Sequence, residues 1–231
     1  MNLTDLLHKK RWIKTQNERQ ILQKAADISA GAYLQVMKNI ISPGVSEAVV
    51  DAALEFECIK GGGQRLAYPP VVAGGINANT LHYIFNDSLL KDGEMILIDA
   101  GTEYYCYSSD ITRTFPINGK FSPAQEALYE MVLEVQKKCI ELCTVDSTLN
   151  SIHTNSVYLL CRGLIQLGIC KESFNSLVSS GRYRRFYPHG VGHYLGMLAF
   201  FTITSFQYIS TLVFFFEGMS TILQAYLMER C

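Results

Sequence analysis

Apolar positions along the first quarter of the chain recur at intervals of three and four residues. The segment 17–41 shows this spacing, and Pro43 and Gly44 end it. Such periodicity predicts an amphipathic helix that stops before the proline. Ser46 can cap a second helix, which the triple glycine 61–63 ends. Two helices are therefore expected before the first strand.

The pattern in the middle of the chain changes from helical to strand-like. Proline and glycine make the segment 67–79 extended and rich in turns. After a turn at Asp92-Gly93, the apolar run 94–101 predicts a buried strand. The segment 104–117 is rich in aromatic and β-branched residues, which predicts the antiparallel partner of that strand.

Two more helices follow this predicted hairpin. Ser122 is a good N-cap, Pro123 suits the first helical position, and Gln125 completes a capping box. A further helix is expected over 148–167, ending at Gly168. This order of elements predicts an α+β fold in which helices cover one face of a mainly antiparallel sheet.

Composition and charge narrow the functional classes. The chain has 231 residues and a net charge of −1, which suits a globular domain and lacks the basic excess of a nucleic-acid surface. We therefore expect no nucleic-acid partner. Seven cysteines, an odd number without a C-x-x-C motif, are typical of reduced thiols in an intracellular protein. The N-terminus lacks the apolar core of a signal peptide.

The last part of the chain has a different character. No Asp, Glu, Lys or Arg occurs between Phe186 and Phe216, and the run 198–216 is 19 residues long. That length is close to the ~20 residues that span a bilayer, but the run also holds Thr and Ser and many residues that favour strands. A membrane-spanning tail, buried strands and a non-native tail are all left open.

Two aspartates in the predicted hairpin are the first candidates for chemistry. Asp99 ends the apolar strand, and Asp110 stands in the segment expected to pair with it. A carboxylate at the end of a buried strand must be exposed, hydrogen-bonded or bound to a cation. If the two segments pair, the carboxylates can face each other, and facing carboxylates favour a cation between them.

Two histidines four residues apart form the second candidate pair. His189 and His193 are separated by Gly-Val-Gly and preceded by Pro188, which argues against a helix. In a strand, positions four apart lie about 13 Å from each other, because each residue rises ~3.3 Å. At most one of the two can then bind a given metal ion, and the other would serve the substrate. His82 is a third candidate in a strand-like run. Carboxylates with imidazole suit Mn²⁺ or a similar divalent metal.

Three stretches that contain these residues resemble one known family. "GGGQRLAYPPVVAGGINANTLHY", "KDGEMILIDAGTEYYCYSSDITRTFPINGKFSPAQEALYEMVLEVQ" and "YPHGVGHYLGM" are similar to aminopeptidase P, the Xaa-Pro aminopeptidases of the pita-bread metallopeptidases. The resemblance covers roughly 12–197. It is greatest to the mitochondrial eukaryotic branch, which implies a mitochondrial location, although a cytoplasmic one is left open because no clear targeting peptide is present.

The resemblance implies a fold, a reaction and residue roles. The family has the pita-bread fold and uses two divalent metals, usually Mn²⁺, to remove the residue that precedes a proline at the second position of a peptide. Asp99 resembles the ligand that chelates one metal, Asp110 the carboxylate that bridges both, and His193 the imidazole ligand. His82 and His189 resemble the histidines that contact the substrate or stabilise the transition state.

The sequence also departs from the family. The segments are expected to be a remnant linker (1–16), a partial and incomplete pita-bread domain (17–197) and a divergent tail (198–231). After Met197 the family's Asp-Val-His-Asp is replaced by Leu-Ala-Phe-Phe, and neither Thr-Ile-Glu-Pro-Gly nor Arg-Ile-Glu-Asp, which carry two glutamate ligands, occurs. The segment around Glu217 resembles the first of these motifs only weakly.

These departures predict weak metal binding and little peptidase activity, since two anionic ligands are lost. Three readings follow: an impaired Xaa-Pro aminopeptidase, an inactive variant that is an interaction module or a misspliced product, and a form anchored in a membrane by 198–216. Self-association into a homo-oligomer is also left open.

Overall fold

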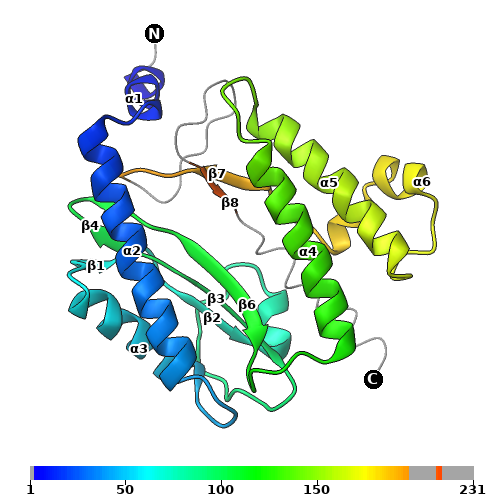
Figure 1. The fold of residues 1–231 in the computed structure, drawn as a ribbon, viewed down its shortest axis with the longest axis horizontal. Helices are drawn as coiled ribbons and strands as arrows, with labels where there is room; N and C mark the ends of the chain where they lie inside the picture. The colour runs from blue at the N-terminus through cyan, green and yellow to red at the C-terminus, as the bar shows by residue number, and fades with distance from the viewer. Residues whose placement is uncertain (1–2, 198–211, 215–231) are drawn as a thin grey trace.

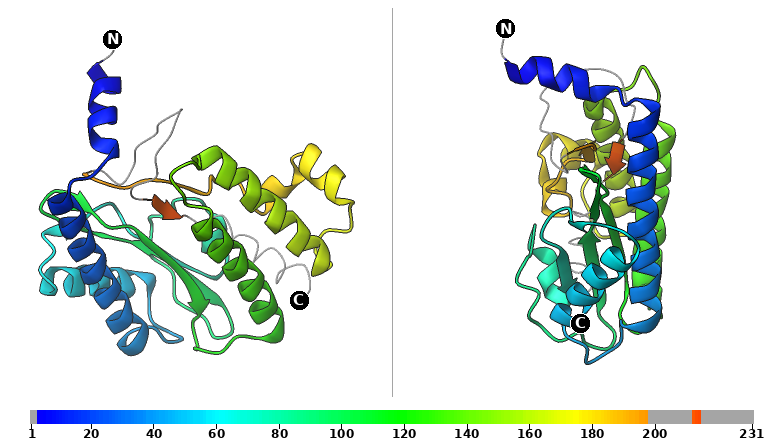
Figure 2. Two further views of the ribbon diagram at one scale, coloured as in Figure 1. Left: turned by 45° about the horizontal axis from the view of Figure 1, so that its top comes forward. Right: turned by 90° about the vertical axis from the view of Figure 1, so that its left-hand side faces the viewer.

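The computed structural model describes residues 3–197 and 212–214, and the N-terminal part of this region is helical. The first three helices are α1 (Leu3–Trp12), α2 (Gln16–Asn39) and α3 (Glu47–Lys60). The two helices predicted on either side of Pro43 are confirmed as α2 and α3, which pack against each other. Helix α1, which projects from the end of α2 in both views of Figure 2, lies within the residues expected to form a linker.

Helix boundaries follow side-chain caps. The hydroxyl of Ser122 accepts a hydrogen bond from the backbone N–H of Gln125, whose side chain in turn accepts one from the backbone of Ser122. This capping box confirms the predicted start of α4 (Pro123–Glu141). Helix α5 (Leu149–Gln166) confirms the helix predicted over 148–167.

The central sheet has three antiparallel strands in the order β2-β3-β6. These are β2 (Val71–Gly74), β3 (Met95–Ala100) and β6 (Ile111–Pro116). The apolar strand predicted over 94–101 is confirmed as β3, which is buried along its whole length. Val71 and Thr112 are the neighbours of Asp99 in the two flanking strands.

The segment predicted as one strand over 104–117 is in fact divided. Tyr105 and Cys106 have positive φ angles of 47° and 65° and make a tight turn, which an extended strand cannot contain. The strands on either side of this turn form a second antiparallel sheet with a short upstream strand. It consists of β1 (Arg65–Leu66), β4 (Thr102–Tyr104) and β5 (Tyr107–Ser108) in that order. Within the segment 104–117, β6 is the part that pairs with β3.

The two faces of the central sheet are covered differently. Side chains of α2 and α3 pack on one face in a cluster of buried residues that includes Tyr33, Val36, Val50, Leu54, Val72, Ile96 and Ile98. The opposite face carries Val71, Ala73 and Leu97, which pack on Tyr83 and on the 3₁₀ helix η1 (Gly75–Asn79). Because side chains alternate along a strand, Asp99 belongs with Leu97 to the face away from α2 and α3.

A second core lies between α4, α5 and the segment after them. Leu128, Leu160 and Cys161 are among its buried residues, and Figure 1 shows α4 and α5 side by side, away from α2 and α3. Cys139 is also buried there. The six described cysteines are free.

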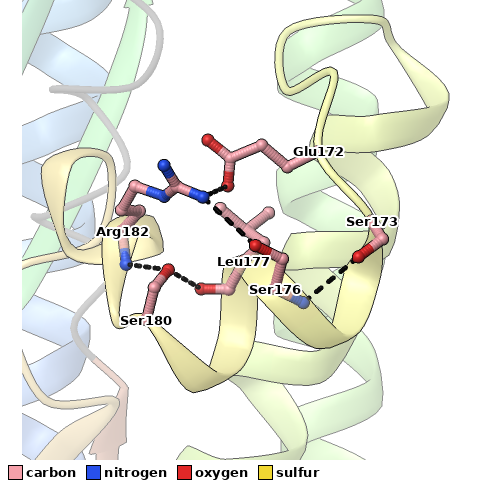
Figure 3. A network of polar contacts seen from close by, with 6 residues as sticks. All are labelled: Glu172, Ser173, Ser176, Leu177, Ser180 and Arg182. Atoms are coloured by element: carbon pink, nitrogen blue, oxygen red, sulfur yellow. Dashed lines mark hydrogen bonds and ion pairs between the residues drawn. The ribbon is translucent and has the colours of Figure 1, made fainter.

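Two short elements that the sequence did not predict lead toward His189. They are α6 (Phe174–Ser179) and the 3₁₀ helix η2 (Arg182–Arg185). Figure 3 shows how they are joined: the Arg182 guanidinium lies 2.8 Å from the Glu172 carboxylate and donates to the Ser176 hydroxyl at 3.1 Å. These contacts order the chain just before Tyr187.

The last described elements form a two-stranded ribbon. Strand β7 (Gly192–Tyr194) pairs with β8 (Leu212–Phe214), and His193 is opposite Val213. No helix in the described part of the chain is long and apolar enough to cross a membrane. Apart from β8, the run 198–216 lies outside the described residues, so the membrane reading stays a prediction.

Candidate active site

Asp99 and Asp110 lie together at the end of the β3–β6 pair. Both are buried, with exposed fractions of 3% and 8%. The hydroxyl of Tyr68 donates to Oδ1 of Asp99 at 2.5 Å and to Oδ1 of Asp110 at 2.9 Å. The strand pairing therefore brings the two carboxylates to one hydroxyl, as the expected hairpin implied.

Tyr68 is a donor that keeps its proton. Burial, followed by the charges of Asp99 and Asp110, raises the pKa of Tyr68 well above its usual value. A phenol between two carboxylates is held neutral, because ionisation would add a third negative charge. The O–H group is thus the hydrogen-bond donor that the two facing carboxylates share.

His193 approaches the same carboxylate from β7. Its Nε2 lies 3.5 Å from Oδ2 of Asp110, and its Nδ1 lies 2.8 Å from the backbone oxygen of Tyr194. A carbonyl oxygen can only accept, so Nδ1 donates to it, and Nε2 is the ring nitrogen that faces Asp110. A carboxylate oxygen and an imidazole nitrogen are both ligand types that divalent metals bind.

The donor set fits a divalent metal only in part. Oδ2 of Asp110 is buried and accepts no hydrogen bond from the described residues, which is what a coordinating oxygen looks like without its ion. Yet no group of three or more His, Cys, Asp or Glu side chains within 3–197 and 212–214 is arranged to hold a metal ion. Asp110 and His193 therefore make a half-site, and Asp99 is joined to it through Tyr68.

His82 and His189 meet at a different point. Their rings are 6.0 Å apart between centroids and nearly perpendicular, at 87°. His82 does not lie in a strand as its neighbours suggested: it follows η1 in a turn, with a φ of 52°, because Thr80 ends the 3₁₀ helix and the chain reverses. His189 likewise precedes β7, which begins only at Gly192.

The pair His189 and His193 is thus divided between two partners. His189 lies against His82, while His193 lies against Asp110. The inference that one metal ion does not take both rings agrees with this arrangement, although the rings are separated by a bend rather than by a continuous strand.

Sequence reasoning missed two side chains near these groups. Tyr68 was seen only as part of a turn-rich segment, and its position before two prolines was the one available signal. His153 on α5 lies 5.4 Å from the Tyr187 ring, and its pKa is lowered by burial and then by Arg184 and His189. A neutral imidazole therefore lies behind the segment that carries His189.

Comparisons with known proteins agree on one lineage. The sequence profile of metallopeptidase family M24 matches residues 20–219. Xaa-Pro aminopeptidase 3 of Mus musculus is 44% identical over 196 residues, which is 85% of this chain and 38% of the mouse protein. The human protein of that name is 45% identical over 193 residues, 83% of this chain and 38% of its own length.

Solved structures show the same fold. Pseudomonas aeruginosa aminopeptidase PepP superimposes with a TM-score of 0.83 at 43% identity, over 86% of this chain and 45% of that one. Proline aminopeptidase P II from Yersinia pestis gives a TM-score of 0.81 at 38% identity, over 84% and 44%. The described residues are therefore part of an aminopeptidase P fold, the pita-bread fold, and the chain spans about 38% of the length of the Xaa-Pro aminopeptidase 3 relatives compared. By its sequence match and by its fold, the chain belongs to metallopeptidase family M24.

Proposed function

We propose that this chain carries part of the active site of a metal-dependent aminopeptidase of the Xaa-Pro type. The observation that supports this most is the 3.5 Å approach of His193 to a buried Asp110 oxygen that accepts no hydrogen bond from the described residues. The relatives named Xaa-Pro aminopeptidase 3 support the reaction class. The substrates would be peptides with proline at the second position.

Asp99, Asp110 and His193 are the proposed metal ligands. Two carboxylates and one imidazole favour Mn²⁺ or a similar divalent ion over a thiolate site, and two such ions are proposed for the complete site. Bound divalent ions would lower the pKa of water and polarise the peptide carbonyl. Tyr68 donates to one oxygen of each carboxylate, and the second oxygen of Asp110 faces His193.

His82 and His189 are proposed to act on the substrate side. Their rings meet edge to face, away from the Asp110–His193 contact, and His189 Nδ1 lies 2.9 Å from the backbone oxygen of Gly190. A carbonyl oxygen can only accept, so Nδ1 donates to Gly190 and Nε2 is the ring nitrogen left for the substrate. The pair can orient a peptide and hold or receive a proton during bond cleavage.

The activity of this chain is proposed to be impaired. The family motifs that carry two glutamate ligands do not occur in the sequence, and no three metal-binding side chains converge among the described residues. Fewer anionic ligands weaken binding of paired divalent ions. Slow or absent turnover is therefore expected, and the same observation favours a second candidate, a non-catalytic variant that acts as an interaction module.

A mitochondrial location is proposed from relatives. "Intermediate cleaving peptidase 55, mitochondrial" of Arabidopsis thaliana is 41% identical over 196 residues and covers 84% of this chain. A tagged full chain imaged with organelle markers would test this location, and exclusion from mitochondria would contradict it.

The reaction class is tested by turnover of a fluorogenic Xaa-Pro peptide with Mn²⁺, against the matched Xaa-Ala peptide. We expect slow hydrolysis that requires proline, stops with chelator and is lost in Asp110→Asn. Asp92→Asn is the control, because Asp92 bonds only Asn118 at an exposed turn. Chelator-insensitive or proline-independent cleavage would contradict the reaction class. Two tightly held Mn²⁺ with fast turnover would contradict the impairment, and no turnover would favour the non-catalytic variant.

A further inference from the structure

The loop that carries His82 is attached to the protein by one buried carboxylate. Glu47 is the first residue of α3 and is 0% exposed. The loop, residues 74–88, runs from the end of β2 through η1 and the His82 turn to Ser88. An acidic residue at this position of a helix is common at the surface, where it interacts with the helix dipole. Full burial therefore needs another explanation.

All four contacts of the Glu47 carboxylate go to this loop. Oε1 accepts from the backbone N–H of Gly74 at 2.7 Å and from the side chain of Asn77 at 2.9 Å. Oε2 accepts from the Tyr83 hydroxyl at 2.9 Å and from the backbone N–H of Ser88 at 3.0 Å. The two ends of the loop and the residue next to His82 are thus bound to one side chain.

The loop contains backbone geometry that needs such support. His82 and Asn86 have φ angles of 52° and 48°, in the left-handed region that non-glycine residues adopt at a cost of about 1 kcal/mol or more each. Such conformations persist when the surroundings fix them from several sides. The Asn86 side chain adds further bonds, to Val72 N, Pro70 O and Asp51, so the segment after His82 is held as well.

We propose that Glu47 is the positioning residue for His82: through Gly74, Asn77, Tyr83 and Ser88 it fixes the loop so that the His82 ring meets His189. Glu47 does not touch the substrate side itself. It acts through the loop, and its distance in sequence from His82 hides the connection. The expected effect of Glu47 on turnover rests on the proposed function of His82, whereas its effect on the position of the His82 loop does not.

The chemistry of the four donors makes a carboxylate necessary. A carboxylate offers only acceptors, and here two donors face each of its oxygens. In Glu47→Gln one oxygen becomes an NH₂ group of nearly the same shape, and the backbone N–H that faces it, that of Gly74 or that of Ser88, loses its acceptor. Because the site is fully buried, water cannot relieve this mismatch, and the loop must shift.

The test compares the His82 ring signals in NMR spectra of the metal-free full chain. Glu47→Gln is expected to move the His82 ring resonances and to remove the through-space contact with the His189 ring. Glu18→Gln is the matched control, because Glu18 also accepts from a tyrosine hydroxyl and a backbone N–H, those of Tyr107 and Thr15. It should leave the His82 signals unchanged.

Two further measurements keep the outcome decisive. Asn77→Ala removes one donor to Glu47 without altering the carboxylate, so it should shift the same signals by a smaller amount. This milder variant serves as the test if Glu47→Gln does not fold. Where turnover is measurable, Glu47→Gln should lower kcat about 10- to 100-fold with a smaller change in KM. His82 signals and the His189 contact that are unchanged in either folded variant would overturn the proposal. Shifted His82 signals in Glu47→Gln, together with no turnover in the unmodified chain, would favour the non-catalytic variant and retain the positioning role.

Discussion

Replacing Tyr68 by phenylalanine tests whether one hydroxyl holds the two site carboxylates together. The change removes only the oxygen, so the shape of the site is kept. The hydroxyl contacts two carboxylates, at 2.5 and 2.9 Å, but it has one proton to share. The loss should therefore equal one hydrogen bond to a charged acceptor, about 1.5–3 kcal/mol, rather than twice that value.

The consequence of Tyr68→Phe should depend on metal. Without metal, two buried carboxylates lose their common donor, and a loss of ~2 kcal/mol lowers the melting temperature by about 4–8 °C for a chain of this size. A divalent cation between the carboxylates replaces the lost proton, so saturating Mn²⁺ should reduce the difference between variant and unmodified chain. Thermal melts in chelator and in Mn²⁺ measure both effects.

Tyr107→Phe is the control for this experiment. Tyr107 also donates to a carboxylate, Glu18 at 2.7 Å, but does so away from Asp99 and Asp110. We expect a smaller loss there, within ~1 kcal/mol, and no response to Mn²⁺. If Tyr68→Phe melts like the unmodified chain, or if its loss matches that of Tyr107→Phe in both buffers, the reasoning is refuted.

Three further predictions concern packing, capping and thiols. Leu160→Ala empties a position that is 0% exposed in the core between α4 and α5 and should cost about 2–5 kcal/mol in denaturant unfolding; a loss within ~0.5 kcal/mol would contradict that core. Ser122→Ala should cost ~1 kcal/mol in the same assay, and an unchanged midpoint would mean that the cap is not needed. Exposed Cys106 should react with a thiol reagent in the folded chain, as mapped by mass spectrometry, before Cys139 and Cys161, whose pKa burial raises to about 11. Because the unfolded thiols ionise first, stability should fall as pH rises from ~9 to ~11, and a flat profile would contradict the raised pKa values.

The sequence predicted those helices and strands whose start, end and periodicity depend on residues that are neighbours in the chain. The helix that starts at Ser122 needs only a cap, a proline and apolar periodicity, and all three are neighbours in sequence. Strand β3 could also be predicted from the sequence, because burial of an apolar run such as the one that leads to Asp99 is favourable. The proximity of Asp99 and Asp110 followed once these two segments were paired.

The missed features depend on residues that are distant in sequence. The turn at Tyr105 and Cys106 forms between β4 and β5. Strand β4 also pairs with β1, where Glu103 is opposite Arg65, 38 residues earlier in the sequence. A strand as short as β1 carries no periodicity of its own. Glu47 resembled any acidic residue in a first helical turn, since its four donors lie 27 to 41 residues away. Sequence spacing contains none of this information.

The site's two halves differ in how firmly the fold holds them. Asp99 lies in β3 and Asp110 immediately precedes β6, two strands that pack on α2 and α3, so the carboxylates are fixed by the main core and by Tyr68. His193 lies on β7, which pairs with the short β8, and two residues after β7 the backbone oxygen of Gly196 accepts a hydrogen bond from Ser108 N at 2.9 Å. A two-stranded ribbon is marginally stable alone. We therefore expect the imidazole half of the site to lose its geometry before the carboxylate half does.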